Sequence, residues 1–219
     1  MRGMVVSPAA FAWQMRLLAT LGYRGLSMTG LMPYLRGEQQ GRVVGITLDD
    51  GYRNNLDHAV PALQRHGFSA TCYVVSRATG QTNSWDAAQG VPTQPLMSDH
   101  DLTRWIGAGM EVGAHSRHHV RLESVDDATA RDEILGCRAD LEQRLAAPVR
   151  HFCYPYGLYG PRDVDLVREA GYDTATTTRR GRVGPGDDLL QLNRVLVACS
   201  THTGHFLAKL LTRYEDRRG

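Results

Sequence analysis

Two carboxylates stand side by side in "GITLDDGYRNN", residues 45–55, directly after an apolar run that ends at Leu48. The run predicts a buried β-strand, and Gly51 ends it. Asp49 and Asp50 carry like charges that repel, and a divalent cation within reach would remove the repulsion and keep both ionised. One carboxylate could then bind the cation while the other acts as a base. The alternative is structural, with one aspartate capping the next helix and the other solvated.

Histidines at a spacing suited to metal ligands occur in "GAHSRHH", residues 113–119. His115 and His119 are expected on one face of a helical turn, where two neutral imidazoles and one carboxylate would leave an open position on a catalytic metal. His118 reaches the same face, so spacing alone leaves the second ligand open between His118 and His119. By itself this segment is better interpreted as a polar surface turn. Together with the aspartate pair it favours a joint site.

The elements expected around these residues alternate between strands and helices. Strands are predicted at 43–48, 69–75, 110–115, 149–155, 173–178 and 193–198, and helices at 8–21, 56–65, 98–109, 126–146, 161–172 and 204–214. Such alternation implies right-handed crossovers and a mostly parallel sheet, whose strands carry chemistry at their carboxyl ends. The aspartate pair, "GAHSRHH" and "YPYG" at 154–157 all follow strands. We therefore expect them at one rim of the sheet.

Composition narrows the class of protein. The 219 residues are 42% apolar and 22% charged, which predicts one globular domain over residues 1–219. The net charge of +2 is dispersed, so nucleic acid is not expected as a partner. No apolar stretch approaches the ~20 residues of a transmembrane segment, and the first residues are unlike a signal peptide. A cytoplasmic protein is expected from the chain as given, with export open if its start is truncated; the oligomeric state is left open.

Three segments in order resemble the motifs of the polysaccharide deacetylases, which are carbohydrate esterase family 4 and contain the NodB-homology domain. "TLDDGY" is similar to the first motif, Thr-Phe-Asp-Asp-Gly, with Leu48 in place of Phe. "HSRHH" is similar to the second, His-Ser/Thr-x-x-His, and "FCYPYG" to the third, a strand that ends in Pro-Tyr-Gly. The resemblance extends over nearly all the chain. It implies an α/β fold, a distorted (β/α) barrel of about seven strands, either complete or incomplete at its N-terminus.

The resemblance also implies roles for individual residues. Asp49 would be the catalytic base, and Tyr156 would offer its backbone N–H to the oxyanion. Asp50, His115 and His119 would hold a divalent metal, expected to be Zn²⁺ with Co²⁺ or Ni²⁺ as alternatives, which resolves the second ligand in favour of His119. The implied reaction is hydrolysis of the acetamido groups of an N-acetylhexosamine polysaccharide or oligosaccharide. A carbohydrate is thus the expected partner.

Two positions depart from the family pattern. The arginine that usually orients the catalytic aspartate is replaced by Cys153, and Arg194 in a late strand either reaches Asp49 instead or is an ordinary surface arginine. The histidine of the fifth motif is not recognisable, and His202 and His205 are the only histidines near its place. Two alternative functions follow. One is a catalytically impaired carbohydrate-binding domain that retains the metal site, and the other is an amidohydrolase acting on a different small amide.

Four residues are assigned to the sugar. Trp85, in the long polar loop expected over 76–95, is the first candidate for stacking on the apolar face of a pyranose. Tyr52 and Tyr156 are further aromatic candidates, and Pro155 belongs to the same expected surface. All four lie within or directly after the segments that resemble the family motifs, or in the loop between them.

Overall fold

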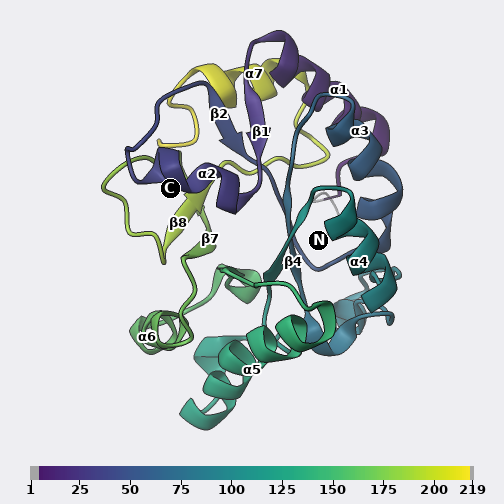
Figure 1. Cartoon of the computed structure of the whole chain (residues 1–219), viewed down its shortest axis with the longest axis vertical. Coiled ribbons are helices and arrows are strands. Elements are labelled where there is room, and N and C mark those ends of the chain that lie inside the picture. Colours follow the sequence, from purple (N-terminus) through teal and green to yellow (C-terminus); the bar gives the residue numbers. More distant parts are fainter. Residues whose placement is uncertain (1–4, 218–219) are drawn as a thin grey trace.

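The computed structural model describes residues 5–217, and its centre is a curled parallel sheet of six strands (Figure 1). The strands lie side by side in chain order and are β3 (Thr47–Leu48), β4 (Thr71–Val74), β5 (Glu111–Ala114), β6 (His151–Cys153), β7 (Thr174–Arg180) and β8 (Leu192–Arg194). Every neighbouring pair is parallel. The carboxyl ends of these strands therefore meet at the same edge of the sheet.

A two-stranded parallel sheet continues from the first. Its strands are β1 (Arg24–Leu26) and β2 (Val43–Gly45). Ile46 joins β2 to β3, since its N–H donates to the Leu26 carbonyl and its own carbonyl accepts from the N–H of Thr71, both at 2.9 Å. Counted as one strand, β2 and β3 bring the number of neighbouring strands to about the seven predicted. The expected distorted (β/α) barrel fold is confirmed.

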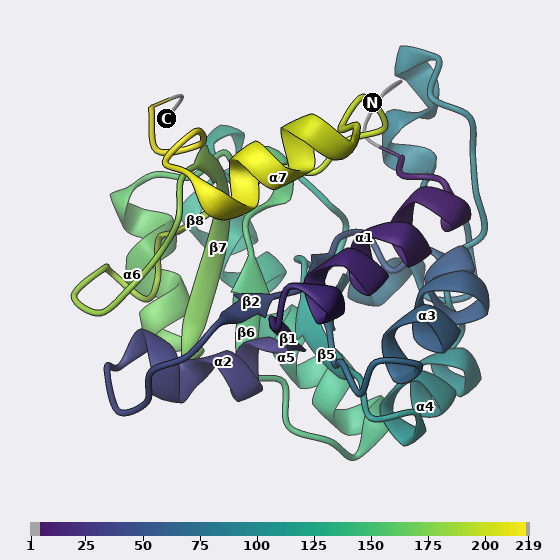
Figure 2. The ribbon, with the colours of Figure 1, turned by 90° about the horizontal axis from the view of Figure 1, so that it is seen from above.

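Helices surround the sheet (Figure 1). They are α1 (Pro8–Thr20), α2 (Met28–Leu35), α3 (Val60–Gln64), α4 (Asp99–Gly107), α5 (Asp127–Leu145), α6 (Pro161–Glu169) and α7 (Thr203–Leu211). Figure 2 shows α1 and α7 side by side, and Trp13 of α1 meets Phe206 of α7 edge to face with ring centroids 6.2 Å apart. The last helix of the chain therefore packs against the first.

Several helices begin at residues whose side chains cap them. The Ser7 side chain accepts from the N–H of Ala10 at 3.2 Å before α1, and the Asp126 side chain accepts from Thr129 at 2.7 Å before α5. Ser98 and Asp101 form a reciprocal capping box at the start of α4. These contacts satisfy N–H groups that have no partner within the helix.

The predicted helix over 56–65 and the last predicted strand differ from their expected form. The segment expected as a helix over 56–65 begins as a π-helical turn, η1 (Asn55–Ala59), in which the N–H of Val60 donates to the carbonyl of Asn55. Pro61 has no N–H to donate, and this interrupts the regular α-helical ladder before α3. The last strand is shorter than predicted because its pairing with β7 ends at Arg194.

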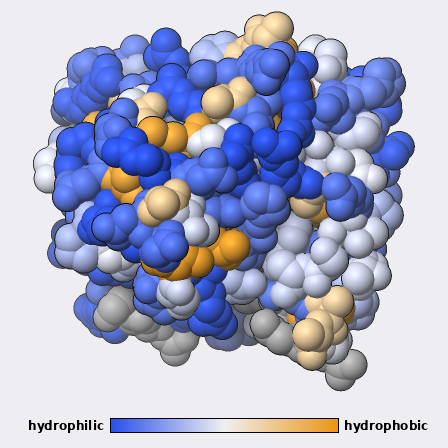
Figure 3. Space-filling model, turned by 90° about the horizontal axis from the view of Figure 1, so that it is seen from below, coloured by the Kyte–Doolittle hydropathy of each residue, from blue (hydrophilic) through white to orange (hydrophobic). Residues whose placement is uncertain are grey.

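Aromatic side chains fill the interior. Trp105, Tyr73, Phe152 and Tyr154 are among the largest fully buried side chains, and the hydroxyl of Tyr154 donates to the Leu190 carbonyl at 2.9 Å. The face in Figure 3 is mostly hydrophilic, with hydrophobic residues in small areas between polar ones. Across residues 5–217, no helix has the length and apolar character needed to cross a membrane.

Candidate metal centre and active site

Three strand ends bring the predicted residues to one site. Asp49 and Asp50 follow β3 directly, His115 follows β5, and Tyr156 lies in the 3₁₀ turn η5 (Pro155–Gly157) after β6. The N–H of His115 still donates to the Val74 carbonyl of β4 at 2.9 Å, so the sheet ladder fixes the backbone of this histidine. The parallel topology thus places these side chains together although they are far apart in the sequence.

Asp50, His115 and His119 form a compact group of potential metal ligands. The Nε2 atoms of both histidines lie 3.4 Å from the same oxygen, Oδ1 of Asp50. All three side chains are buried, with exposed fractions of 7%, 2% and 4%. Burial alone would raise the pKa of Asp50, but the neighbouring imidazoles outweigh it and keep that pKa well below its ordinary value. The carboxylate is therefore ionised in the site.

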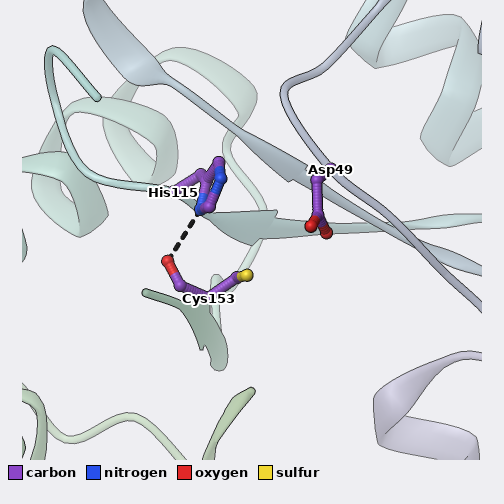
Figure 4. A group of neighbouring side chains, drawn as sticks. All are labelled: Asp49, His115 and Cys153. Atoms are coloured by element: carbon purple, nitrogen blue, oxygen red, sulfur yellow. Dashed lines mark hydrogen bonds between the residues drawn. The ribbon is translucent and has the colours of Figure 1, made fainter. Parts of the chain in front are cut away.

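The chemistry of this group fits a divalent cation. Ligand atoms about 2.0–2.1 Å from a tetrahedral Zn²⁺ are about 3.4 Å from one another, which matches the two Asp50–histidine separations. Nδ1 of His115 lies 2.7 Å from the Cys153 carbonyl, which can only accept, so Nδ1 carries a proton and Nε2 is the ring atom left for a cation (Figure 4). Burial lowers the pKa of His119 and favours the neutral imidazole that binds metal.

The histidine segment is not the helical turn that the sequence predicts. Residues 115–120 contain no helix, and Ser116 and His119 have φ values of 62° and 57°. The hydroxyl of Ser116 accepts from the N–H of His119 at 3.0 Å and closes this loop. The two left-handed residues turn the His119 side chain back toward His115, whose ring centroid lies 4.9 Å away. Convergence thus comes from the loop conformation rather than from helical spacing.

Unusual backbone conformations gather at the site. Five non-glycine residues among those described have positive φ, and four of them are Asp50, Ser116, His119 and Tyr156. Each such residue costs roughly 1–3 kcal/mol and persists only where surrounding contacts require it. The fold therefore expends stability to aim these residues, as is typical of functional sites.

Helix α5 holds the histidine loop in place. The carboxylate of Glu133 accepts from the backbone N–H of His118 at 2.9 Å and contacts its Nδ1 at 2.6 Å. The His118 side chain thus points to α5 and is 56% exposed, so the structure does not bring it into the ligand group. The guanidinium of Arg117 donates two hydrogen bonds of 2.9 Å to Asp140, which also accepts from the Ser76 hydroxyl at 3.0 Å. Sequence reasoning missed both acidic residues of α5.

Replacing Asp140 with alanine is expected to lower the free energy of unfolding by about 2 kcal/mol, because the buried Ser76 hydroxyl and part of the Arg117 guanidinium would lose their acceptor. Asp132→Ala is the matched control, since Asp132 also accepts from Arg117 but its side chain is 60% exposed. That variant is expected to lose less than about 1 kcal/mol. Urea denaturation measures the free energy of unfolding of both variants. Equal losses of stability would contradict the role of Asp140 in holding the histidine loop.

Asp49 is held by an arginine from the far end of the chain. Nη1 and Nη2 of Arg194 donate to the two carboxylate oxygens of Asp49 at 2.7 and 2.9 Å, and Nε donates to the Thr177 carbonyl at 2.7 Å. Burial alone would raise the pKa of Asp49, but the charge and hydrogen bonds of Arg194 outweigh it and lower that pKa. Cys153, at the usual place of the family arginine, lies 3.5 Å from Nη2 of Arg194.

A second group could also be considered for a metal, namely Asp49, His115 and Cys153 (Figure 4). Arg194 already occupies both oxygens of Asp49, and a guanidinium there repels a second cation. The dashed line in Figure 4 shows that Nδ1 of His115 is engaged with the Cys153 backbone, which leaves only Nε2, the atom directed at Asp50. The group that contains Asp50 is therefore the better cation site.

The four residues predicted to bind the sugar differ in their contacts with the Asp50–His115–His119 group. Trp85 stacks on His119, with ring centroids 4.7 Å apart and planes 19° apart, so one of its faces is covered. The Tyr156 ring meets His119 edge-on at 4.4 Å. Burial and the charge of Asp50 raise the pKa of the Tyr52 phenol well above its ordinary value. Pro155 is buried in the turn that presents Tyr156.

Asp86 was not anticipated from the sequence. It lies in the 3₁₀ turn η3 (Ser84–Gln89), is 1% exposed, and its Oδ1 accepts from the Tyr156 hydroxyl at 3.3 Å. The sequence marks Asp86 only by its position next to Trp85.

His202 and His205, the histidines near the expected fifth motif, stack on each other with ring centroids 3.9 Å apart, and His202 precedes α7.

Comparisons with known proteins identify the family of the chain. The family model described as polysaccharide deacetylase matches residues 36–175. The Bacillus subtilis protein YxkH is 22% identical over 190 residues, which are 86% of this chain but only 64% of YxkH. The poly-beta-1,6-N-acetyl-D-glucosamine N-deacetylase of Staphylococcus epidermidis is 23% identical, over 88% of this chain and 68% of that protein.

Among solved structures, IcaB from Ammonifex degensii has the same fold. Its TM-score is 0.83 at 24% identity, over 94% of this chain and 90% of IcaB. The family match covers more than half of the chain and includes the aspartate pair, the histidine loop and the turn at Tyr156. The chain belongs to the polysaccharide deacetylase family.

Proposed function

We propose that this protein is a metal-dependent N-deacetylase that hydrolyses the acetamido groups of an N-acetylhexosamine polysaccharide or oligosaccharide. The observation that carries the proposal is the buried Asp50–His115–His119 group beside an ionised Asp49 that Arg194 holds with two hydrogen bonds. Membership of the family supports it, as does the similarity to a poly-beta-1,6-N-acetyl-D-glucosamine N-deacetylase.

Asp50, His115 and His119 would hold the divalent cation, expected to be Zn²⁺ with Co²⁺ or Ni²⁺ as alternatives. When bound, such a cation polarises the acetyl carbonyl and lowers the pKa of a coordinated water from ~15.7 toward ~7. Three protein ligands leave room for substrate and water. Asp50 contributes the charge of the set, and the two histidines contribute neutral nitrogen donors.

Asp49 would accept the proton of the attacking water. Its ionised state suits this task, and Arg194 fixes both of its oxygens so that the carboxylate does not rotate away. The backbone N–H of Tyr156 would donate to the oxyanion that develops on the carbonyl oxygen. Removing one such donor typically costs about 10²-fold or more in rate, so a backbone N–H is a sufficient contributor.

The sugar would lie over the ligand group. Trp85 and Tyr52 border the group on the side of Asp50 and His119, and Tyr156 borders it from β6. Aromatic side chains pack well on the apolar face of a pyranose, and their polar atoms bind hydroxyl groups at its edge. Pro155 would act by shaping the turn under the sugar.

Acetate release tests the proposal. Protein loaded with Zn²⁺ or Co²⁺ is incubated with fragments of chitin, peptidoglycan and poly-β-1,6-N-acetylglucosamine, and free acetate is measured. Release from at least one fragment is expected, and it should stop when the metal is chelated and return when it is restored. Binding of fragments without release under any metal would favour the impaired binding domain instead. Release only from small acylated compounds would favour the amidohydrolase alternative.

The impaired binding domain is suggested by two departures from the family pattern, the unrecognisable histidine of the fifth motif and Cys153, which cannot supply the charge of the family arginine. Arg194 delivers a guanidinium to Asp49 from β8, so the orienting charge is present although it comes from another strand. This contact removes the argument from Cys153 and supports the enzyme, while the acetate-release assay decides the argument from the fifth-motif histidine.

Removal of the Arg194 charge is expected to shift the pH dependence of the reaction. Burial and the nearby Asp50 both raise the pKa of Asp49, and Arg194 opposes them. In Arg194→Met the pKa of Asp49 should therefore rise, so the acidic limb of kcat/KM moves to higher pH. Arg194→Lys keeps a charge without the paired geometry, and its limb should move less. pH–rate profiles of the two variants measure the shift, and an unmoved limb in Arg194→Met would refute the role.

A further inference from the structure

Asp86 connects the loop that carries Trp85 to the turn η5, which contains Tyr156. This carboxylate is 1% exposed, its Oδ1 accepts from the Tyr156 hydroxyl at 3.3 Å, and its Oδ2 has no hydrogen-bond partner within residues 5–217. Burying a carboxylate with one unpaired oxygen costs stability, so packing alone does not explain the presence of Asp86 at this position. The adjacent Trp85 stacks on His119, so the loop contacts both the turn and a metal ligand.

Tyr156 has a backbone conformation that an aromatic residue rarely adopts. Its φ and ψ are 59° and 0°, in the left-handed region. Contacts at both ends hold it there. The Thr178 hydroxyl donates to its carbonyl at 3.4 Å, the Arg121 guanidinium lies 4.9 Å from its ring centroid, and its phenol is bound to Asp86. A strained backbone conformation persists only where surrounding contacts impose it. The contacts of the Tyr156 side chain therefore help to fix the direction of the Tyr156 backbone N–H.

We propose that Asp86 is a positioning residue for the reaction, acting through the Tyr156 phenol to hold the Tyr156 backbone N–H where it meets the oxyanion. This inference rests on the proposed deacetylase function. Asp86 acts here as a hydrogen-bond acceptor, and neither its charge nor a proton transfer is required. The oxyanion develops only in the transition state, so the effect belongs to kcat rather than to KM.

A double-mutant cycle tests the assignment. Asp86→Ala and Tyr156→Phe each remove one partner of the same hydrogen bond, and each is expected to lower kcat about 10-fold with KM little changed, since the donor is misaligned rather than lost. The double variant should be no slower than either single variant, because the interaction is already broken. Asp86→Asn keeps an acceptor oxygen and should retain kcat within about 2-fold. Multiplicative losses, or an Asp86→Asn as slow as Asp86→Ala, would overturn the assignment.

Tyr159→Phe is the matched control. Its hydroxyl also belongs to a tyrosine just after β6, but it donates to Gln191 at 3.2 Å, away from Asp86. This variant should keep the wild-type kcat. Zinc content and melting temperature are measured for every variant, and all are expected to bind zinc as the wild type does.

Crystal structures of the variants separate this inference from the proposed function. In Asp86→Ala the Tyr156 backbone should leave the left-handed region, and in Asp86→Asn it should remain there. If Tyr156 keeps a φ near 59° in Asp86→Ala, the positioning role is refuted whatever the enzyme does. If the wild type releases no acetate from any fragment, the proposed function fails, while the Tyr156 conformation still decides whether Asp86 holds the turn.

Discussion

Replacing Asp49 with asparagine is expected to lower kcat for acetate release about 10³-fold while zinc stays bound. Asparagine has nearly the same shape and still offers one oxygen to Arg194, but its amide cannot take a proton from water. Asp49 lies outside the Asp50–His115–His119 ligand group, so the metal should be unaffected. The measurement pairs kcat on N-acetylglucosamine oligomers with zinc per chain, determined by atomic emission on the same preparation.

Asp57→Asn is the control for the loss of one negative charge near the site. Asp57 lies in the π-helical turn after the aspartate pair, its side chain is 47% exposed, and its carboxylate is 3.7 Å from Arg53. Exposed pairs of this kind contribute little, so kcat should stay within about 2-fold of the wild type. An Asp49→Asn variant with full zinc and wild-type kcat would exclude Asp49 as the base.

Much of the site follows from strand ends, and these are readable in the sequence. The apolar run up to Leu48 predicts a strand whose end carries Asp49 and Asp50, and "MEVGAH" does the same for His115. Parallel topology then brings both ends to one edge without any knowledge of loops. The contact between Arg194 and Asp49 follows the same logic, because β8 belongs to the same sheet; the sequence could name Arg194 as a candidate but not decide it.

Residue spacing could not predict the conformation of the histidine loop, residues 115–120. A separation of four residues suggests a helix, yet His119 arrives beside His115 through left-handed residues at Ser116 and His119 itself. Positive φ at a non-glycine residue is imposed by tertiary contacts, here the carboxylates of Glu133 and Asp140 on α5. Such contacts join residues distant in the chain, and no local pattern announces them. Asp86 was missed for the same reason.

Very short elements were also missed. β1 has three residues, Arg24–Leu26, and no alternation of apolar and polar side chains that would mark a strand. Its pairing with β2 places Gly25 where an added Cβ would meet the Phe68 ring at 2.7 Å. β1 therefore forms because its backbone pairs with β2. Gly25 has no side chain, and this lets the Phe68 ring pack against the strand.

Two neighbouring histidines give the sharpest test of the metal site. His119→Ala removes a nitrogen whose partner oxygen on Asp50 is 3.4 Å away, and it is expected to raise the Kd for zinc by more than about 100-fold, since losing even a residue that only orients a ligand costs 10- to 100-fold. His118→Ala removes the adjacent imidazole, which is 56% exposed and contacts Glu133 instead. Its Kd for zinc should stay within about 3-fold of the wild type, because the backbone N–H of residue 118 still donates to Glu133 and keeps the loop in place.

Competition with a fluorescent zinc chelator measures both constants without any assay of activity, and acetate release follows on the same samples. The expected pattern is a zinc-free, inactive His119→Ala beside a loaded, active His118→Ala. The reverse pattern would mean that His118 turns into the site and that His119, despite its buried place between Trp85 and Tyr156, is structural. Equal loss in both variants would instead indicate that the loop as a whole unfolds, which circular dichroism and the melting temperature of each variant would reveal. Because the two substitutions are chemically identical and one residue apart, a difference between them depends only on where the fold directs each ring.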